Sequence, residues 1–303
     1  MATGRADLAA EVLALKRETG ALVLAHNYQL PEVYEVADLI GDSLELARAA
    51  AGTLARFIVF CGVRFMAETA KLLNPDARVV LAAPDAGCQM ADMITAEALA
   101  ARRRELGDVT VVAYVNTPAN VKAGSDICCT SANAARVLGS IPAGRRVLFV
   151  PDRNLAAWAA RESGREVVAW PGFCYVHATF TVADVERARA RWPGAKVVVH
   201  PECPLEVIDA ADRVASTGGM YRLAPELGDV VLGTEAAMCG RITRDFPGVA
   251  CRPLRRTALC VNMKRTRLES VRRALAGEVG AVEVPAPIAG PARRAIERML
   301  ELG

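Results

Sequence analysis

The sequence lacks the features that mark exported, membrane-bound and nucleic-acid-binding proteins. Among its 303 residues no apolar run is longer than a strand requires, so no segment is predicted to cross a membrane. The N-terminus carries Arg5, Asp7 and Glu11 where a signal peptide needs an apolar core, and we therefore expect a cytoplasmic protein. The net charge of +3 is too small to indicate a nucleic-acid or anionic membrane partner.

Cysteine pairs with the spacing of a metal-binding motif are also missing, although the chain holds nine cysteines, of which Cys128 and Cys129 are adjacent. An odd number of cysteines without an export signal argues against a disulfide framework, so the thiols are expected to be reduced. Structural zinc sites usually take their ligands from close pairs such as C-x-x-C, and the sequence contains none. A metal site built from cysteines would have to combine residues that lie far apart in the chain.

What the sequence does contain is an internal repeat of three units. Three strand-like runs, 21–29, 109–117 and 195–203, each end on a ring residue with a polar residue two places later. The pairs are His26 with Tyr28, Tyr114 with Asn116, and His200 with Glu202. Seventeen residues after each ring residue comes a hydroxyl that opens a helix-like segment: Ser43, Ser131 and Thr217. This self-similarity indicates three copies of one structural unit.

A cysteine follows the third strand of each unit. Cys88, Cys174 and Cys260 lie 86 residues apart in both intervals. Three thiolates from separate units suit a zinc ion or an iron–sulfur cluster. Because close ligand pairs are missing, the spacing favours a [4Fe–4S] cluster with one iron left open, a Lewis acid suited to dehydration and condensation. The alternative is that duplication alone repeated three buried cysteines.

The alternation of strands and helices predicts an α/β protein of three homologous parallel-sheet units. An N-terminal helix is expected over 1–20, followed by units over 21–105, 106–192 and 193–303, the last with a C-terminal helix that starts at Pro291. Ligands bind outside the carboxyl ends of parallel strands. Three units around a pseudo-threefold axis would therefore direct their ring residues, hydroxyls and cysteines into one central cavity.

The hydroxyls and histidines each have two interpretations. Ser and Thr at helix starts usually cap the helix, but helix N-termini also bind anions, which would suit a small substrate with several negative charges. His26 and His200 occupy equivalent positions and are expected in the site, whereas His177 is expected to lie behind it. No function is predicted for the remaining cysteines: Cys61, Cys128, Cys129, Cys203, Cys239 and Cys251.

Taken together, the motifs resemble one known family. The segments "AHNYQ", "GDSLELA", "GCQMADM", "CTSANA", "PGFCYVH", "HPEC" and "CVNMK" occur in order from about residue 21 to the C-terminus, as in quinolinate synthases, the A proteins of bacterial NAD biosynthesis. The resemblance implies three α/β domains around a [4Fe–4S] cluster with three cysteine ligands. It also implies condensation of iminoaspartate with dihydroxyacetone phosphate to quinolinate, with release of phosphate and two waters, and a functional link to an enzyme that produces iminoaspartate.

Residue roles follow from the same resemblance. The cluster ligands would be Cys88, Cys174 and Cys260, and Tyr28 would lie near the open iron. The substrate contacts would be His26, Ser43, Tyr114, Asn116, Ser131, His200, Glu202 and Thr217. Tyr28, His200 and Glu202 are the expected catalytic residues, since condensation to an aromatic ring requires several proton transfers.

One motif departs from some members of the family, and two other functions remain open. Those members carry C-x-x-C-x-x-C at the third ligand, whereas this chain reads "CVNMK", so no local disulfide switch is expected there. The alternatives are a zinc-dependent hydrolase with three thiolate ligands and a non-catalytic iron–sulfur sensor. A sensor would need a DNA-binding or docking element, and the sequence shows no basic recognition helix.

Overall fold

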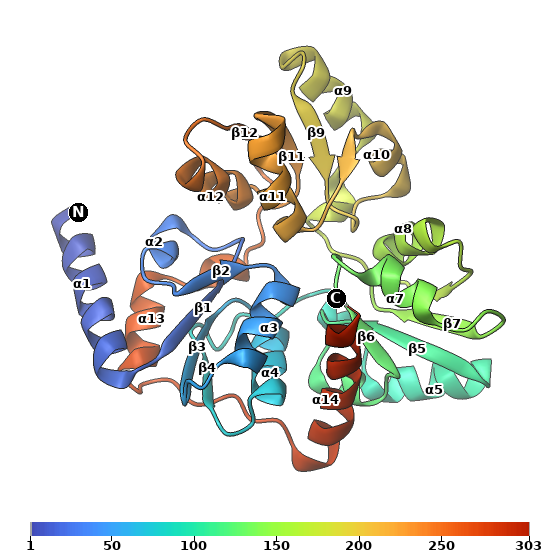
Figure 1. Ribbon diagram of the computed structural model, residues 1–303, viewed down its shortest axis with the longest axis horizontal. Helices are drawn as coiled ribbons and strands as arrows, with labels where there is room; N and C mark the ends of the chain where they lie inside the picture. Colours follow the sequence, from blue (N-terminus) through green and yellow to red (C-terminus); the bar gives the residue numbers. More distant parts are fainter. Residues whose placement is uncertain (1, 303) are drawn as a thin grey trace.

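The computed structural model describes residues 2–302, with side chains from residue 5 onward. Three parallel four-stranded sheets surround a common centre (Figure 1), with strand orders β2-β1-β3-β4, β6-β5-β7-β8 and β10-β9-β11-β12. The predicted class, three homologous α/β units with pseudo-threefold symmetry, is confirmed. No helix among the described residues is both long and apolar enough to span a bilayer.

Each unit has the same order of elements. The first follows α1 (Ala2–Thr19) and consists of β1 (Leu22–His26), α2 (Pro31–Tyr34), β2 (Leu39–Gly41), α3 (Ser43–Gly52), β3 (Phe57–Cys61), α4 (Arg64–Leu73), β4 (Arg78–Leu81), the 3₁₀ helix η1 (Ala91–Met93) and α5 (Ala96–Leu106). The second consists of β5 (Val109–Tyr114), α6 (Ala119–Ala123), β6 (Ile127–Cys129), α7 (Ala134–Ser140), β7 (Arg146–Val150), α8 (Arg153–Ser163), β8 (Val168–Ala169), η2 (His177–Thr179) and α9 (Val182–Arg191). The third consists of β9 (Lys196–Val199), α10 (Leu205–Ala210), β10 (Arg213–Val214), α11 (Thr217–Leu227), β11 (Asp229–Gly233), α12 (Ala237–Asp245), β12 (Ala250–Pro253), η3 (Met263–Arg265) and α13 (Leu268–Leu275), and α14 (Ala286–Glu301) ends the chain.

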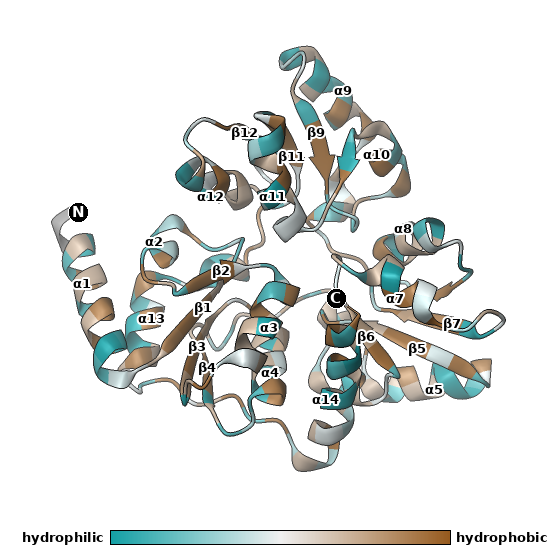
Figure 2. Cartoon of the chain, in the orientation of Figure 1, coloured by the Kyte–Doolittle hydropathy of each residue, from teal (hydrophilic) through white to brown (hydrophobic). Residues whose placement is uncertain are grey.

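The central strands are apolar because helices cover both faces of each sheet. β1, β3, β5, β7, β9 and β11 are rich in Val, Leu, Ile and Phe, and most of their side chains are buried, as parallel sheets require. Figure 2 shows these strands in brown and the outward faces of the helices in teal. The order with β1 beside β3 places a topological switch point at their carboxyl ends, where parallel sheets bind ligands.

The helix that ends each repeat packs on the next sheet rather than on its own. α5 contacts β5, α9 contacts β9, and α13 contacts β3 and α1 of the first unit. The last of these contacts closes the ring of units, since α13 lies beside α1 (Figure 1). The boundaries 21–105, 106–192 and 193–303 remain predictions; by packing, α5, α9 and α13 associate with the sheets that they cover.

Two details of the sequence-based expectation were wrong. A short edge strand, β2, β6 or β10, lies between the ring residue and the hydroxyl of each unit and was not predicted; these strands have only two or three residues. The C-terminal helix α14 begins at Ala286, not at Pro291, which lies inside it. Pro287 in the first turn already provides the favourable helix start. α14 packs against α4, α6 and β6, between the first and second units.

Candidate active site

The carboxyl ends of the strands surround one cavity of about 720 Å³, including its opening to solvent. Its wall contains every residue assigned to the site from the sequence: His26, Tyr28, Ser43, Cys88, Tyr114, Asn116, Ser131, Cys174, His200, Glu202, Thr217 and Cys260. All three units contribute, and members of each equivalent set lie far apart in the chain. The structure therefore brings the twelve residues together, as the repeat predicts.

The three cysteines occupy the same local structure in each unit. Cys88, Cys174 and Cys260 each stand three residues before the first residue of a 3₁₀ helix, η1, η2 or η3. Backbone N–H groups at these turns face the sulfurs and act to lower the pKa values of the thiols: those of Ala91 and Met90 at Cys88, that of His177 at Cys174, and those of Met263 and Asn262 at Cys260. The repeat has thus preserved the loop that presents each thiol, and not only the cysteine.

The chemistry of this donor set fits a cluster with three thiolate ligands. All nine cysteines are free thiols, and the three in the cavity are half-buried. Burial raises the pKa of the Cys88 thiol to about 12 and also raises the pKa values of Cys174 and Cys260. Thiolates in such surroundings require a nearby cation or metal. N–H groups directed at sulfur are among the contacts that tune iron–sulfur clusters.

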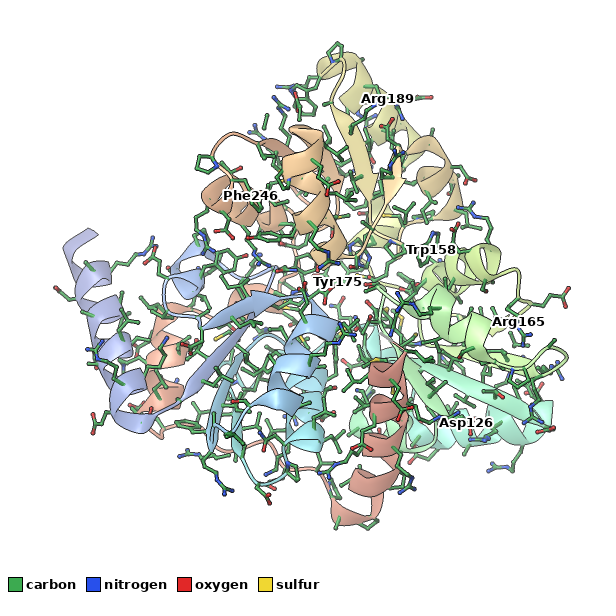
Figure 3. The ribbon with its side chains drawn as sticks, in the orientation of Figure 1. Asp126, Trp158, Arg165, Tyr175, Arg189 and Phe246 are labelled. Carbon is green, nitrogen blue, oxygen red and sulfur yellow. The ribbon has the colours of Figure 1, made fainter. Side chains whose placement is uncertain are left out.

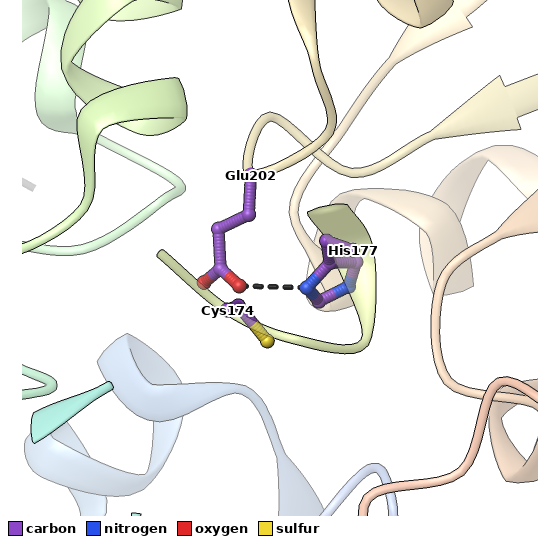
Figure 4. Close-up of side chains that lie close together, drawn as sticks. All are labelled: Cys174, His177 and Glu202. Carbon is purple, nitrogen blue, oxygen red and sulfur yellow. Dashed lines mark ion pairs between the residues drawn. The ribbon is translucent and has the colours of Figure 1, made fainter. Parts of the chain in front are cut away.

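Glu202 is a buried carboxylate of the cavity wall with two short polar contacts. Its Oε1 accepts from the hydroxyl of Tyr114 at 2.5 Å, and its Oε2 lies 2.6 Å from Nδ1 of His177 (Figure 4). Burial raises the pKa of Glu202, but its interactions with His177 and His200 and the hydrogen bonds from His177 and Tyr114 outweigh burial and hold that pKa below its usual range. Glu202 is therefore ionised at neutral pH.

His177 lines the cavity, which corrects the expectation that it lies behind the site. Its ring stacks on that of His200, with 4.4 Å between centroids. Ligand atoms of Cys174, His177 and Glu202 lie within 4.8 Å of one another, so this trio could also hold a single metal ion such as zinc. The sequence signal was its position three residues after Cys174, which places it in the turn that faces the sulfur.

The other two histidines are held neutral. Burial, with the charge of Arg241 next in size, lowers the pKa of His26 to about 3, and burial lowers the pKa of His200 to about 3 as well. The ring of His26 meets that of Tyr28 edge-on, with 4.6 Å between centroids. Neutral imidazoles can donate or accept a hydrogen bond without bringing charge into the cavity.

The three hydroxyls are not the helix caps that one interpretation expected. Ser43 and Thr217 are the first residues of α3 and α11, and the capping side chains are those of the preceding residues, Asp42 and Ser216. Ser131 lies in a turn three residues before α7. All three hydroxyls line the cavity, and Thr217 accepts a hydrogen bond from Asn27 at 2.9 Å.

Comparison with known proteins identifies the family of the chain. The family described as NadA, quinolinate synthetase A protein, matches residues 10–301. A quinolinate synthase of Methanoregula boonei is 54% identical over 294 residues, which is 96% of this chain and 97% of the relative. Quinolinate synthases of Desulforudis audaxviator and Thermococcus onnurineus are 50% and 47% identical, each over 98% of both chains. The chain belongs to the quinolinate synthase family. It is therefore an enzyme, and the family match spans all three units and the whole cavity.

Sequence reasoning missed several residues that support this quinolinate synthase cavity. The buried carboxylates of Asp152 and Glu235 accept the backbone N–H groups of Cys174 at 3.2 Å and Cys260 at 3.4 Å. Glu235 also pairs with Lys264 at 2.8 Å. The same position holds an acid in the second and third units but Val63 in the first, so no repeated signal identified Asp152 and Glu235.

A tyrosine joins two of the cysteine loops at the centre of the molecule (Figure 3). The hydroxyl of Tyr175 donates to the carbonyl of Leu259 at 3.2 Å and accepts from the N–H of Val261 at 2.9 Å. It thereby connects the loop of Cys174 to that of Cys260 and fixes the distance between two prospective ligands.

Proposed function

We propose that the chain condenses iminoaspartate with dihydroxyacetone phosphate to quinolinate, releasing phosphate and two waters, in the cytoplasmic de novo synthesis of NAD. The observation that carries the proposal is the convergence of three equivalent thiols, three hydroxyls and the Glu202 cluster on one cavity. The names of the relatives support the product. The substrate requires a second enzyme that supplies iminoaspartate.

Cys88, Cys174 and Cys260 would hold the cofactor, one [4Fe–4S] cluster per chain. When bound, such a cluster supplies one iron without a protein ligand, a Lewis acid for a hydroxyl or carboxylate of the substrate. The N–H groups of η1, η2 and η3 would stabilise the ligating sulfurs.

The protein side chains would bind the substrates and move protons. Ser43 and Thr217, at the first positions of α3 and α11, would hold phosphate or carboxylate groups through their hydroxyls, which line the cavity. Ser131, Asn116 and His26 would complete the polar contacts from the other walls. Glu202 would accept protons, with His200 and the phenol of Tyr28 as the other groups in reach of the substrate.

The test is anaerobic purification followed by metal analysis and a product assay. We expect about four irons and four sulfides per chain, as a [4Fe–4S] cluster requires. With iminoaspartate generated from oxaloacetate and ammonia, we expect quinolinate and phosphate in equal amounts by mass spectrometry. Zinc in place of iron would favour the site at Cys174, His177 and Glu202, and a complete cluster without quinolinate formation would favour a sensor.

A further inference from the structure

We propose that Lys122 is a positioning residue that holds the turn after β5, which carries Tyr114 and Asn116 into the cavity. Lys122 lies on α6, which packs against α14 and α4, and its side chain is fully buried. Its ammonium donates a hydrogen bond to the backbone carbonyl of Thr117, which ends that turn. Lysine is almost never fully buried without a charged partner, because removing its ammonium from water costs free energy. The buried position therefore indicates a specific role for this ammonium.

The surroundings of Lys122 provide no carboxylate that pairs with it. Among the described residues its ammonium forms no ion pair, and the nearby Glu68 instead accepts the backbone N–H of Ala119 at 2.9 Å. The ammonium also faces the ring of Phe65, with 5.6 Å between Nζ and the ring centroid, and Phe65 lines the cavity. Burial lowers the pKa of Lys122. The hydrogen bond to the turn is thus the contact that accounts for a polar group at this position.

The turn that Lys122 contacts presents two residues of the site. The hydroxyl of Tyr114 donates to Glu202 at 2.5 Å. Asn116 lines the cavity, and its amide oxygen has no partner among the described residues. Within the turn, the hydroxyl of Thr117 donates to the carbonyl of Tyr114 at 3.0 Å. Because Lys122 holds the carbonyl of Thr117, a shift of this residue would move Tyr114 and Asn116 together.

The repeat supports a role in holding the turn. The fourth residue of the short helix after each ring residue is Tyr34 in α2, Lys122 in α6 and Ile208 in α10. The hydroxyl of Tyr34 donates to the backbone carbonyl of Asn27 at 2.7 Å, in the equivalent turn of the first unit. Two units therefore donate a hydrogen bond from this helix position to the turn, whereas the apolar side chain of Ile208 has no donor. What Tyr34 and Lys122 share is the hydrogen bond and not the charge.

The first arm of the test compares binding with stability and rests on the proposed function. The probe is pyridine-2,3-dicarboxylate, the product of the proposed reaction, titrated calorimetrically into the anaerobically purified protein. Lys122→Met removes the donor and nearly keeps the length of the side chain, and it should weaken binding about 10-fold. The melting temperature should not fall, because replacing a buried charge by an apolar side chain is often neutral or stabilising. A purely structural role predicts the reverse, a lower melting temperature with unchanged affinity.

The matched control is Ile208→Met. It places the same new side chain at the equivalent position of the third unit, which is also buried. No hydrogen bond to a turn is lost there, so the affinity for the probe should not change. Iron content should be equal in wild type and in both variants.

The second arm is spectroscopic and does not depend on ligand binding. The chain has five tyrosines, so tyrosine labelled with ¹³C at the ring carbon that bears the hydroxyl gives five signals. The signal of Tyr114, assigned by its loss in Tyr114→Phe, reports the hydrogen bond to Glu202. It should shift in Lys122→Met and keep its position in Ile208→Met, and the signal of Tyr34 should keep its position in both variants.

The outcomes separate this inference from the proposed function. Unchanged affinity for the probe, or an unchanged Tyr114 signal, in Lys122→Met would overturn the positioning role. An equal loss of affinity in Ile208→Met would also overturn it, because packing alone would then explain the effect, and so would a Lys122→Met protein that loses its iron or melts at a lower temperature. A wild-type protein that does not bind the probe would contradict the proposed function and leave the Tyr114 signal to decide the role of Lys122.

Discussion

The first unit presents its cysteine differently from the second and third. In all three units, a backbone N–H at the start of the helix after the third strand, α4, α8 or α12, donates to the carbonyl two residues before the cysteine. These bonds run from Arg64 to Ala86, from Arg153 to Gly172 and from Ala236 to Ala258. The residue before each donor is Val63, Asp152 or Glu235. The two acids also accept the N–H of the cysteine itself, and Val63 cannot.

The difference shows that the hydrogen bonds that support a cysteine loop and the charges near its thiol can vary from one unit to another. Asp152 and Glu235 fix the loops of Cys174 and Cys260, but burial raises the pKa of both carboxyls, that of Asp152 to about 8. When they are ionised, their charges contribute to raising the pKa values of the two thiols. Lys264 offsets part of this effect at Glu235. The loop of Cys88 has neither the additional bond nor the additional negative charge. Equivalent ligands can thus share a backbone and differ in their electrostatic surroundings.

The largest effect is expected when one of the three equivalent cysteines is replaced. Cys88→Ala, Cys174→Ala and Cys260→Ala should each abolish both the cluster and activity, because two thiolates would have to hold what three hold now. Cys128→Ala and Cys251→Ala, outside the cavity, should keep iron near the wild-type value. Iron and sulfide analysis after anaerobic purification is the measurement. A Cys174→Ala protein with a full four irons would show that the ligand assignment is wrong.

The next change makes the third unit resemble the second. The residue two places after the ring residue is an amide in the second unit, Asn116, and a carboxylate in the third, Glu202. Glu202→Gln keeps the size but removes the proton acceptor, and turnover should fall about 100-fold or more with the cluster intact. Glu206→Gln, an exposed change on α10, is the control. Near-normal turnover in Glu202→Gln would exclude this carboxylate from the mechanism.

The sequence was sufficient to predict site residues where the repeat preserves the residue type, and insufficient where the residue type varies between units. Cysteine, ring, polar and hydroxyl positions recur at similar spacing, so twelve of the residues that line the cavity could be predicted together. The partners of the cysteines vary as Val63, Asp152 and Glu235, so no pattern marks them. His177 likewise has no repeated counterpart, and its contacts with Glu202 and His200 form only when the second and third units meet. Hydrogen bonds between distant units depend on packing that residue spacing does not encode.

Substitution of the three hydroxyl residues distinguishes a role in ligand binding from a role in helix capping. Ser43→Ala, Ser131→Ala and Thr217→Ala should weaken the binding of a dicarboxylate analogue, at least two of them by about 1.5–3 kcal/mol, the usual value for a hydrogen bond to a charged group. Melting temperature should change little at positions 43 and 217, because Asp42 and Ser216 cap those helices. Ser216→Ala is the matched control and should lose about 1 kcal/mol of stability instead. Unchanged affinity in all three variants would mean that the shared anion pocket does not exist.

The buried acids allow a test of loop support. Asp152→Ala removes the acceptor for the N–H of Cys174 and for two N–H groups at the start of α8, and we expect a loss of about 1–2 kcal/mol with faster release of iron to a chelator. Thr95→Ala, which removes the cap of α5 on the surface, should lower stability without faster iron release. Equal rates of iron release in the two variants would show that Asp152 supports only its helix.

The smallest expected effect is the contribution of His26, the ring residue of the first unit, to the pH dependence of the free energy of unfolding. His26 is buried and its pKa is lowered to about 3, whereas in the unfolded chain it is near 6.5. Below pH 6.5 the unfolded chain therefore binds a proton that the folded protein does not, so this residue lowers the free energy of unfolding as pH falls toward 3. Between pH 7.5 and 5.5 His26 should contribute a loss of about 1.4 kcal/mol, so the total loss should be smaller by that amount in His26→Gln, in which the similar contribution of His200 remains. Because the two proteins differ only at position 26, the difference between their denaturation midpoints at the two pH values isolates the histidine. The same slope in wild type and variant would mean that His26 takes up a proton in the folded state, and the neutral imidazole assigned to this wall of the cavity would be wrong.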